Sequence, residues 1–114
     1  MALNYNLSKV YALSGNDNEF ALQVTSLFVT EVPQDVKQIE LGIKNKDYHQ
    51  AYSYSHKIKP TFDLLGMTVA HQEILEVEAW AKREGKKKEI EATFESIKIQ
   101  VEKAVKEIKK DFNL

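Results

Sequence analysis

The stretch YHQAYSYSHKIKPTFDLLG, residues 48–66, decides the fold of this chain. Its apolar and small side chains recur at steps of 3, 4, 3, 4 and 3 residues, at Tyr48, Ala51, Ser55, Ile58, Phe62 and Leu65. Because an α-helix turns once in about 3.6 residues, these positions share one face. The stretch therefore predicts a helix packed in a bundle, and Gly66 is expected to act as its C-terminal cap.

Helical periodicity also governs the rest of the chain. A short helix is predicted over residues 7–13 and a long one over residues 19–44, where Pro33 should cause a bend because the apolar stripe continues on both sides. Two more helices are predicted, one from its expected N-cap Thr68 to Gly85 and one after that glycine. Their apolar stripes are Ala70, Ile74, Val77 and Ala81, and then Ile90, Phe94, Ile97, Val101, Ala104 and Ile108.

Turn-forming residues separate the predicted helices. Gly15 is expected to end the first helix, Asp17 or Asn18 to cap the second, and Asp47 to cap the third. The connections are only a few residues long, so neighbouring helices should run antiparallel. We therefore predict an all-α fold, an antiparallel up-down four-helix bundle with a short extra N-terminal helix, formed by residues 1–114 as a single domain.

Composition excludes several classes of protein. The chain has 114 residues, a formal net charge of -1 and no cysteine. This charge gives no overall attraction to nucleic acid or to an anionic membrane, and the lack of thiols excludes disulfides and thiolate metal sites. No signal peptide and no apolar run of the ~20 residues that a membrane span needs is present. We expect a soluble cytoplasmic domain, and a fragment of a larger protein would have the same composition.

The chemically informative residues are His56 and its neighbours on one side of the third helix. His56 lies one residue, about 100°, from the apolar stripe, so we expect it on the flank and partly in water. Lys59, Pro60 and Asp63 follow at i+3, i+4 and i+7 and share its face. Pro60 offers no N–H to the carbonyl of His56 and should bend the helix there. The pattern predicts a surface strip of imidazole, ammonium, a small uncharged ring and carboxylate.

Such a strip suits the transfer of a phosphoryl group. A neutral imidazole is a good nucleophile near neutral pH, and its attack on phosphorus gives a phosphohistidine that remains reactive. Lys59, one turn from His56, is placed to neutralise the added negative charge. Lys57 points elsewhere but raises the local positive potential. Asp63 lies too far along to touch the phosphoryl group, and we expect it to orient the ring, a water molecule or Lys59.

At these positions the chain resembles the histidine-containing phosphotransfer (HPt) domain family. The family pattern is a phosphorylatable His, an apolar residue at +2, Lys at +3, a small residue (usually Gly) at +4 and Gly at +10, and these are His56, Ile58, Lys59, Pro60 and Gly66 here. The order of helices also agrees, including the proline within the long helix. The resemblance covers almost the whole chain, and its departures are Pro60 in place of Gly and the acidic Asp63.

The resemblance implies that His56 is the phosphoacceptor and that Lys59 stabilises the phosphoryl group. Lys57, Pro60 and Asp63 are expected on the docking surface. The chain would be a phosphocarrier rather than an enzyme, and its partners would be the receiver domain of a response regulator, a hybrid sensor histidine kinase, or both. The receiver would supply the acceptor aspartate and Mg²⁺, so no cofactor or metal is expected on this chain. Because four helices already close a core, we expect a monomer.

Two other functions remain open from the sequence. The bundle is an interaction module without chemistry if Pro60 and Asp63 mark a site that has lost its activity. A small metal-dependent hydrolase is the third alternative, but it needs inward-facing His and Glu at i,i+3 or i,i+4, and His71, Gln72 and Glu73 do not form such a set. His49, seven residues from His56, is also too distant to share a metal ion with it.

The remaining conspicuous residues have simpler interpretations. The basic run at residues 86–88 is expected to be a solvated turn at the start of a helix, because acidic residues follow it. Trp80 is expected to pack in the core. Tyr52 and Tyr54 flank the helix of His56, where they either border the docking surface or pack at the rim of the core.

Overall fold

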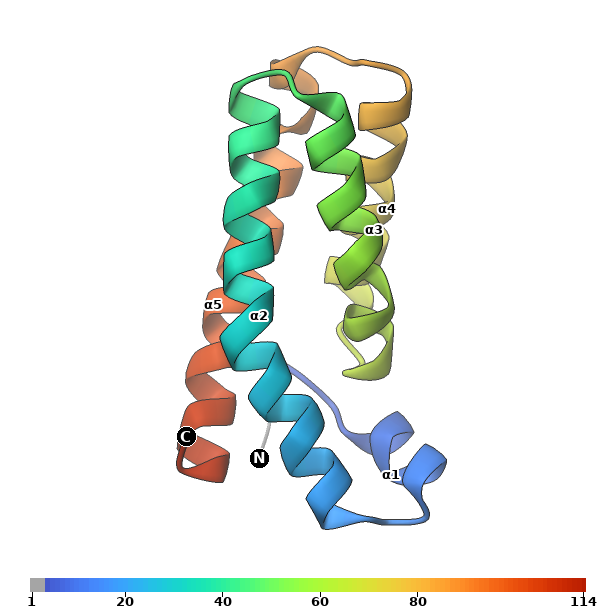
Figure 1. Cartoon of the computed structure of the whole chain (residues 1–114), viewed down its shortest axis with the longest axis vertical. Coiled ribbons are helices and arrows are strands. Elements are labelled where there is room, and N and C mark those ends of the chain that lie inside the picture. Colours follow the sequence, from blue (N-terminus) through green and yellow to red (C-terminus); the bar gives the residue numbers. More distant parts are fainter. Residues whose placement is uncertain (1–3) are drawn as a thin grey trace.

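The computed structural model describes residues 4–114, which form five α-helices. The elements are α1 (Ser8–Ser14), α2 (Asn18–Lys44), α3 (Tyr48–Leu64), α4 (Thr68–Lys82) and α5 (Lys87–Phe112), and residues 4–114 contain no strand. Helices α2 to α5 form an elongated antiparallel bundle, and α1 lies at the end of it where α3 meets α4 (Figure 1). The predicted all-α bundle with a short leading helix is confirmed.

Each long helix contacts two others, so the bundle has four edges, an edge being the line along which two neighbouring helices pack. Helix α3 packs against α2 and α4, and α5 packs against α4 and α2. The α3/α4 edge therefore lies opposite the α2/α5 edge. This arrangement gives the protein two separate long surfaces.

The predicted stripes form the core. All six stripe residues of α5 and all four of α4 are buried. In the stripe of residues 48–65, Tyr48 is partly buried and the other five are buried, namely Ala51, Ser55, Ile58, Phe62 and Leu65. Trp80 is fully buried and its indole N–H donates to the carbonyl of Lys86 at 2.8 Å, so its predicted packing role is confirmed. A buried Trp with its N–H satisfied contributes a large apolar area without a polar penalty.

The helix ends agree only in part with the sequence. Asp17 accepts from the N–H of Glu19 at 2.9 Å, so of the two candidates Asp17 caps α2 and Asn18 is its first residue. Asp47 accepts from the N–H of Gln50 at 3.0 Å, so the predicted N-cap of α3 is confirmed. The prediction for Thr68 is wrong: Met67 occupies the N-cap of α4 without a side-chain hydrogen bond, and Thr68 is the first helical residue.

Two glycines differ in detail from their predicted places. The C-cap of α3 is Leu65, and Gly66 follows it with φ +63°, the left-handed conformation that ends a helix without a Cβ penalty. Helix α4 ends at Lys82, three residues before Gly85. A Cβ on Gly85 would lie 2.5 Å from the ring of Trp80, so this glycine permits close packing on the indole rather than ending the helix.

Both prolines lie inside continuous helices. Helix α2 passes through Pro33, and α3 continues beyond Pro60 to Leu64. In Figure 1 the amino-terminal part of α2 leans away from the line of its carboxyl-terminal part, as expected when a proline removes a helical hydrogen bond.

A close approach between α2 and α3 holds the helix of His56 in place. A Cβ on Gly42 would lie 2.8 Å from the backbone nitrogen of Ala51 and 3.1 Å from the carbonyl oxygen of Asp47. These atoms belong to the backbone, so they cannot move aside as a flexible side chain would. Gly42 therefore sets the spacing at which α3 begins.

We predict that Gly42→Ala lowers the free energy of unfolding by up to about 2 kcal/mol. The loss from overpacking, roughly 1–3 kcal/mol, should exceed the gain of about 1 kcal/mol that Ala normally brings to a helix. Urea denaturation checks this, with Lys44→Ala, two residues further along and exposed, as a control expected within about 0.5 kcal/mol of the original protein. A stabilised Gly42→Ala protein would contradict the proposed spacing.

Candidate functional site

His56 lies near the middle of α3, on the side that faces α4. Its side chain is 61% exposed, as expected from its place one residue off the buried stripe. The ring is nevertheless fixed, because Nδ1 lies 2.9 Å from Oε2 of Glu78 on α4. Exposure of one side of the ring and a hydrogen bond on the other give an accessible imidazole in a defined orientation.

Glu78 is the residue that sequence reasoning missed. Its side chain is only 9% exposed, and its second oxygen, Oε1, accepts from Nζ of Lys59 at 3.0 Å. One buried carboxylate thus joins the two residues that the sequence singled out. The sequence does hold a signal for this residue. Glu78 follows the core residue Val77 and lies one turn after Ile74, so it falls near the buried face of α4, where a carboxylate needs a hydrogen-bond partner.

The carboxylate of Glu78 selects the tautomer of His56. An ionised carboxylate only accepts hydrogen bonds, so Nδ1 of the ring must carry the proton that it donates. In the neutral imidazole this leaves the lone pair on Nε2, the nitrogen that does not contact Glu78. The geometry therefore gives His56 a free nucleophilic nitrogen.

A tyrosine supports the imidazole from the preceding turn of α3. The rings of Tyr52 and His56 are stacked, with centroids 5.7 Å apart and planes inclined by 13°. Nζ of Lys82 lies 5.2 Å from the centroid of the Tyr52 ring, which places a second cation, besides Lys59, near the site. Tyr52 therefore borders the site, whereas Tyr54 lies near Lys57, with Nζ 6.0 Å from its ring centroid.

Lys57 lies on the other flank of α3, as its place on the helix predicted. Its Nζ is 3.0 Å from Oδ1 of Asp35 and 3.9 Å from Oε1 of Glu31, both on α2. The hydrogen bond and the charge of Asp35 raise the pKa of the Lys57 ammonium. Lys57 therefore pairs across the α2/α3 edge and does not contact the imidazole.

Asp63 does not orient the ring or Lys59, contrary to the sequence expectation. Its Oδ1 accepts from Nζ of Lys9 on α1 at 2.7 Å, and this hydrogen bond and charge lower the pKa of the Asp63 carboxyl. The pair is exposed, so it contributes little stability, but it engages the negative charge of Asp63 with α1. Pro60 is exposed one turn after His56.

The described residues form neither a metal cluster nor a membrane span. Within residues 4–114, no three or more His, Asp or Glu side chains are grouped so that they could hold a metal ion. Over this same range no helix is both long enough and apolar enough to cross a membrane.

Comparison with known families gives the identity of the fold. A sequence model of the Hpt domain matches residues 23–111, from the second turn of α2 almost to the end of α5. The chain belongs to the Hpt domain family. Members of the family are phosphocarriers in the histidine phosphotransfer of two-component signalling, and they interact with receiver domains or kinases. Neither the curated proteins nor the solved structures contain a match to this chain.

The match includes every residue of the site in this Hpt domain. His56, Lys59 and Glu78 all fall within residues 23–111, whereas Lys9, the partner of Asp63, precedes the matched region. The contact between α1 and α3 therefore joins a residue inside the matched part of the domain to one that precedes it.

We predict that Glu78→Gln reverses the tautomer of His56. Glutamine has a single acceptor oxygen, which should turn to the ammonium of Lys59 and leave its NH₂ group facing Nδ1. Nδ1 must then accept, so the proton moves to Nε2. The ¹⁵N chemical shifts of the imidazole, measured at a pH where the ring is neutral, distinguish the two forms. Glu76→Gln, an exposed change on α4, is the matched control, and an unchanged tautomer in Glu78→Gln would refute the assigned hydrogen bond.

Proposed function

We propose that this Hpt domain accepts a phosphoryl group on Nε2 of His56 from the aspartyl phosphate of a receiver domain and passes it to another receiver. One observation carries the proposal: an exposed imidazole whose Nδ1 hydrogen bonds to a buried carboxylate, so that Nε2 holds the free lone pair. The orientation needed for attack is already present in the free domain, which lowers the entropic part of the barrier.

The transfer step needs no base on Nε2. The lone pair of Nε2 attacks phosphorus, a new N–P bond forms, and the P–O bond to the receiver aspartate breaks, leaving that side chain as a carboxylate. The imidazole becomes cationic, and its Nδ1–H remains bonded to Glu78, whose negative charge balances it. In the reverse direction the same contact keeps the N–P bond reactive, because the ring leaves as a neutral imidazole.

Lys59 is placed to stabilise the phosphoryl group. Its ammonium shares Glu78 with the ring and its side chain is 26% exposed, so the cation lies beside the imidazole and is partly open to solvent. A charge-assisted hydrogen bond to a phosphoryl oxygen is among the stronger polar contacts in proteins. Mg²⁺ and the acceptor aspartate would come from the receiver, and no cofactor is proposed on this chain.

The docking surface is proposed around the exposed part of α3. Pro60 presents a small side chain one turn from His56, Lys57 supplies a cation on one flank, and Asp63 supplies an anion towards α1. Gly66 ends the helix just beyond this surface. The proposed partner is a receiver domain, either free or within a hybrid sensor kinase. The chain itself is proposed to act as a single monomeric Hpt domain.

Binding without chemistry is the competing function. It was suggested by Pro60 and by the acidic Asp63, which would repel a phosphoryl group. The pairing of Asp63 with Lys9 weakens the reason for expecting that repulsion. The hydrogen bond between Glu78 and His56 leaves Nε2 as the nucleophilic nitrogen, which chemistry at the ring requires and binding alone does not. These contacts favour phosphotransfer.

We predict that His56→Gln abolishes phosphoryl uptake from a phosphorylated receiver domain, because glutamine has no nucleophilic ring nitrogen. Transfer of ³²P to the original chain should give an acid-labile, base-stable product. His49→Gln and His71→Gln, the other two histidines, should be labelled as fully as the original chain, and circular dichroism should show the same helical content in all variants. Labelling that survives in His56→Gln would identify a different acceptor.

We also predict that Lys59→Ala slows transfer by roughly 10- to 100-fold. A hydrogen bond to a charged group contributes about 1.5–3 kcal/mol, and about 1.4 kcal/mol corresponds to a factor of ten in rate. Quench-flow measurement of phosphoryl transfer tests this, with Lys44→Ala as a remote control. Lys59→Arg, which keeps the charge, should retain more of the rate than Lys59→Ala. An unchanged rate in Lys59→Ala would remove this residue from the mechanism.

A further inference from the structure

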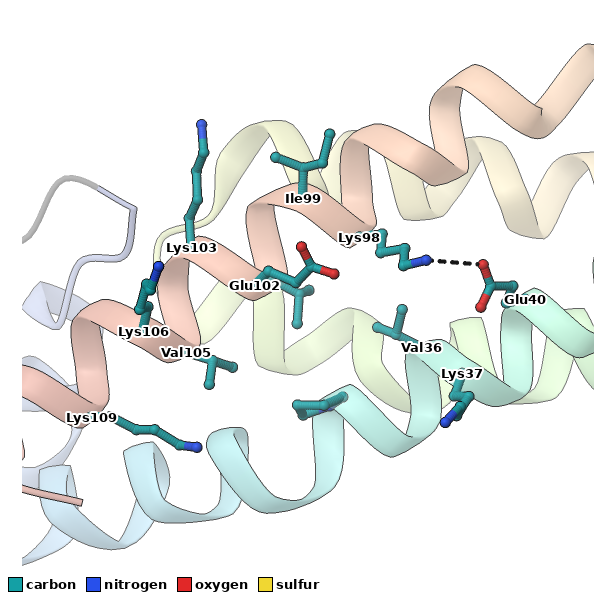
Figure 2. A pocket seen from close by; sticks show the side chains of 12 residues that line it. Val36, Lys37, Glu40, Lys98, Ile99, Glu102, Lys103, Val105, Lys106 and Lys109 are labelled. Carbon is teal, nitrogen blue, oxygen red and sulfur yellow. Dashed lines mark hydrogen bonds and ion pairs between the residues drawn. The ribbon is translucent and has the colours of Figure 1, made fainter.

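A groove of about 710 Å³ lies between α2 and α5, on the edge of the bundle opposite His56 (Figure 2). On the α5 side its lining extends from Lys98 to Lys109, which corresponds to about 16 Å, or three helical turns. Phosphotransfer as proposed above uses none of these residues. The groove is therefore a second surface, separate from the site of phosphotransfer.

The floor of the groove is apolar. It is lined by Pro33 and Val36 of α2 and by Val101 and Val105 of α5. Val36 and Val101 also belong to the buried core, whereas Pro33 and Val105 are partly buried. In Figure 2 the side chains of Val36 and Val105 point into the space between the two helices. Pro33, which lies inside α2, is thus part of the lining of the groove between the two helices.

The rim of the groove is strongly basic, although the chain as a whole has a formal net charge of -1. Five lysines and two glutamates line it. Lys98 is neutralised by Glu40, with Nζ 3.2 Å from Oε2. The other four lysines make no ion pair with any carboxylate of residues 4–114, and they are Lys37, Lys103, Lys106 and Lys109.

We propose that this groove binds an amphipathic helix with an apolar face and acidic flanks, supplied by a partner protein. Both walls are helices whose backbone groups are already hydrogen bonded, so the groove cannot add a strand and must be filled by side chains. A third helix laid between α2 and α5 would cover Pro33 and Val105, the floor residues that are only partly buried. Its acidic flanks would meet the lysines of the rim, which gives the complementarity of charge.

The groove is poorly suited to other anionic partners. Nucleic acid would place its phosphates against Glu40 and Glu102, and it would leave the apolar floor without a partner. A flat lipid surface would contact the exposed rim but would not reach the recessed valines. The combination of a concave apolar floor and a basic rim favours a cylindrical acidic helix.

The position of the groove has a consequence for assembly. Because the α2/α5 edge lies opposite the α3/α4 edge, a helix in the groove and a receiver at His56 can bind at the same time. The partner helix would then act as a tether that keeps the domain near a protein of its pathway. Such tethering raises the effective concentration of the partners without changing the chemistry at His56.

A peptide titration of the full chain tests the proposal without any phosphoryl transfer. The probe is a synthetic helical peptide of about 16 residues with leucines on one face and glutamates on its flanks, long enough to populate a helix. A scrambled peptide of the same composition has the same charge but no apolar face. Amide NMR shifts of the chain, followed during the titration, give both the site and the affinity.

The expected result is a set of shift changes centred on residues 33–40 and 98–109. Lys106→Glu with Lys109→Glu should weaken binding at least tenfold, whereas Lys88→Glu with Lys110→Glu, an equal change in charge on the same helix outside the groove, should alter it less than threefold. The scrambled peptide should bind much more weakly than the ordered one.

Several outcomes would overturn the proposal. Equal binding of the two peptides would mean that only charge is recognised, and shift changes around His56 would place the peptide at the other edge. Tighter binding of duplex DNA or of phosphatidylserine vesicles at the same lysines would assign the groove to another class of partner. Self-association that fills the groove with a second copy of the chain, detected by sedimentation, would also overturn the proposal. Each result leaves phosphoryl uptake on His56 to be judged separately.

Discussion

The buried carboxylate of Glu78 is the contact on which the site depends. It accepts one hydrogen bond from the ring of His56 and one from the ammonium of Lys59, so each of its oxygens is used. A charge this deeply buried would be costly without partners, and the two donors offset that cost. The same pair of contacts links α3 to α4 and places the three side chains in one arrangement before any partner arrives.

This arrangement divides the imidazole into two functional sides. Nδ1 is bound to the protein and Nε2 is left to solvent, so the ring is both fixed and reachable. Tyr52 stacks against it and limits its tilt. A phosphocarrier needs this balance, because a mobile ring would attack slowly and a buried ring would not meet its partner.

The two flanks of α3 pair with different neighbouring helices. On one flank Lys57 pairs with the buried Asp35 of α2, and on the other Lys59 pairs with Glu78 of α4. Gly42 lets α2 approach the start of α3 closely, and Lys9 of α1 engages Asp63 near its end. The helix is therefore held by three neighbours, while the surface between His56 and Pro60 stays open.

The sequence by itself determined the helices, their buried stripes and the exposed place of His56, because all of these follow from the period of a single helix. The sequence could not predict the contacts between side chains of different helices. Glu78 stands 22 residues from His56, and no spacing rule joins residues on different helices. The pairing of Asp63 with Lys9 and the basic groove between α2 and α5 were hidden for the same reason. Only the packing of the helices decides which side chains from distant parts of the chain meet.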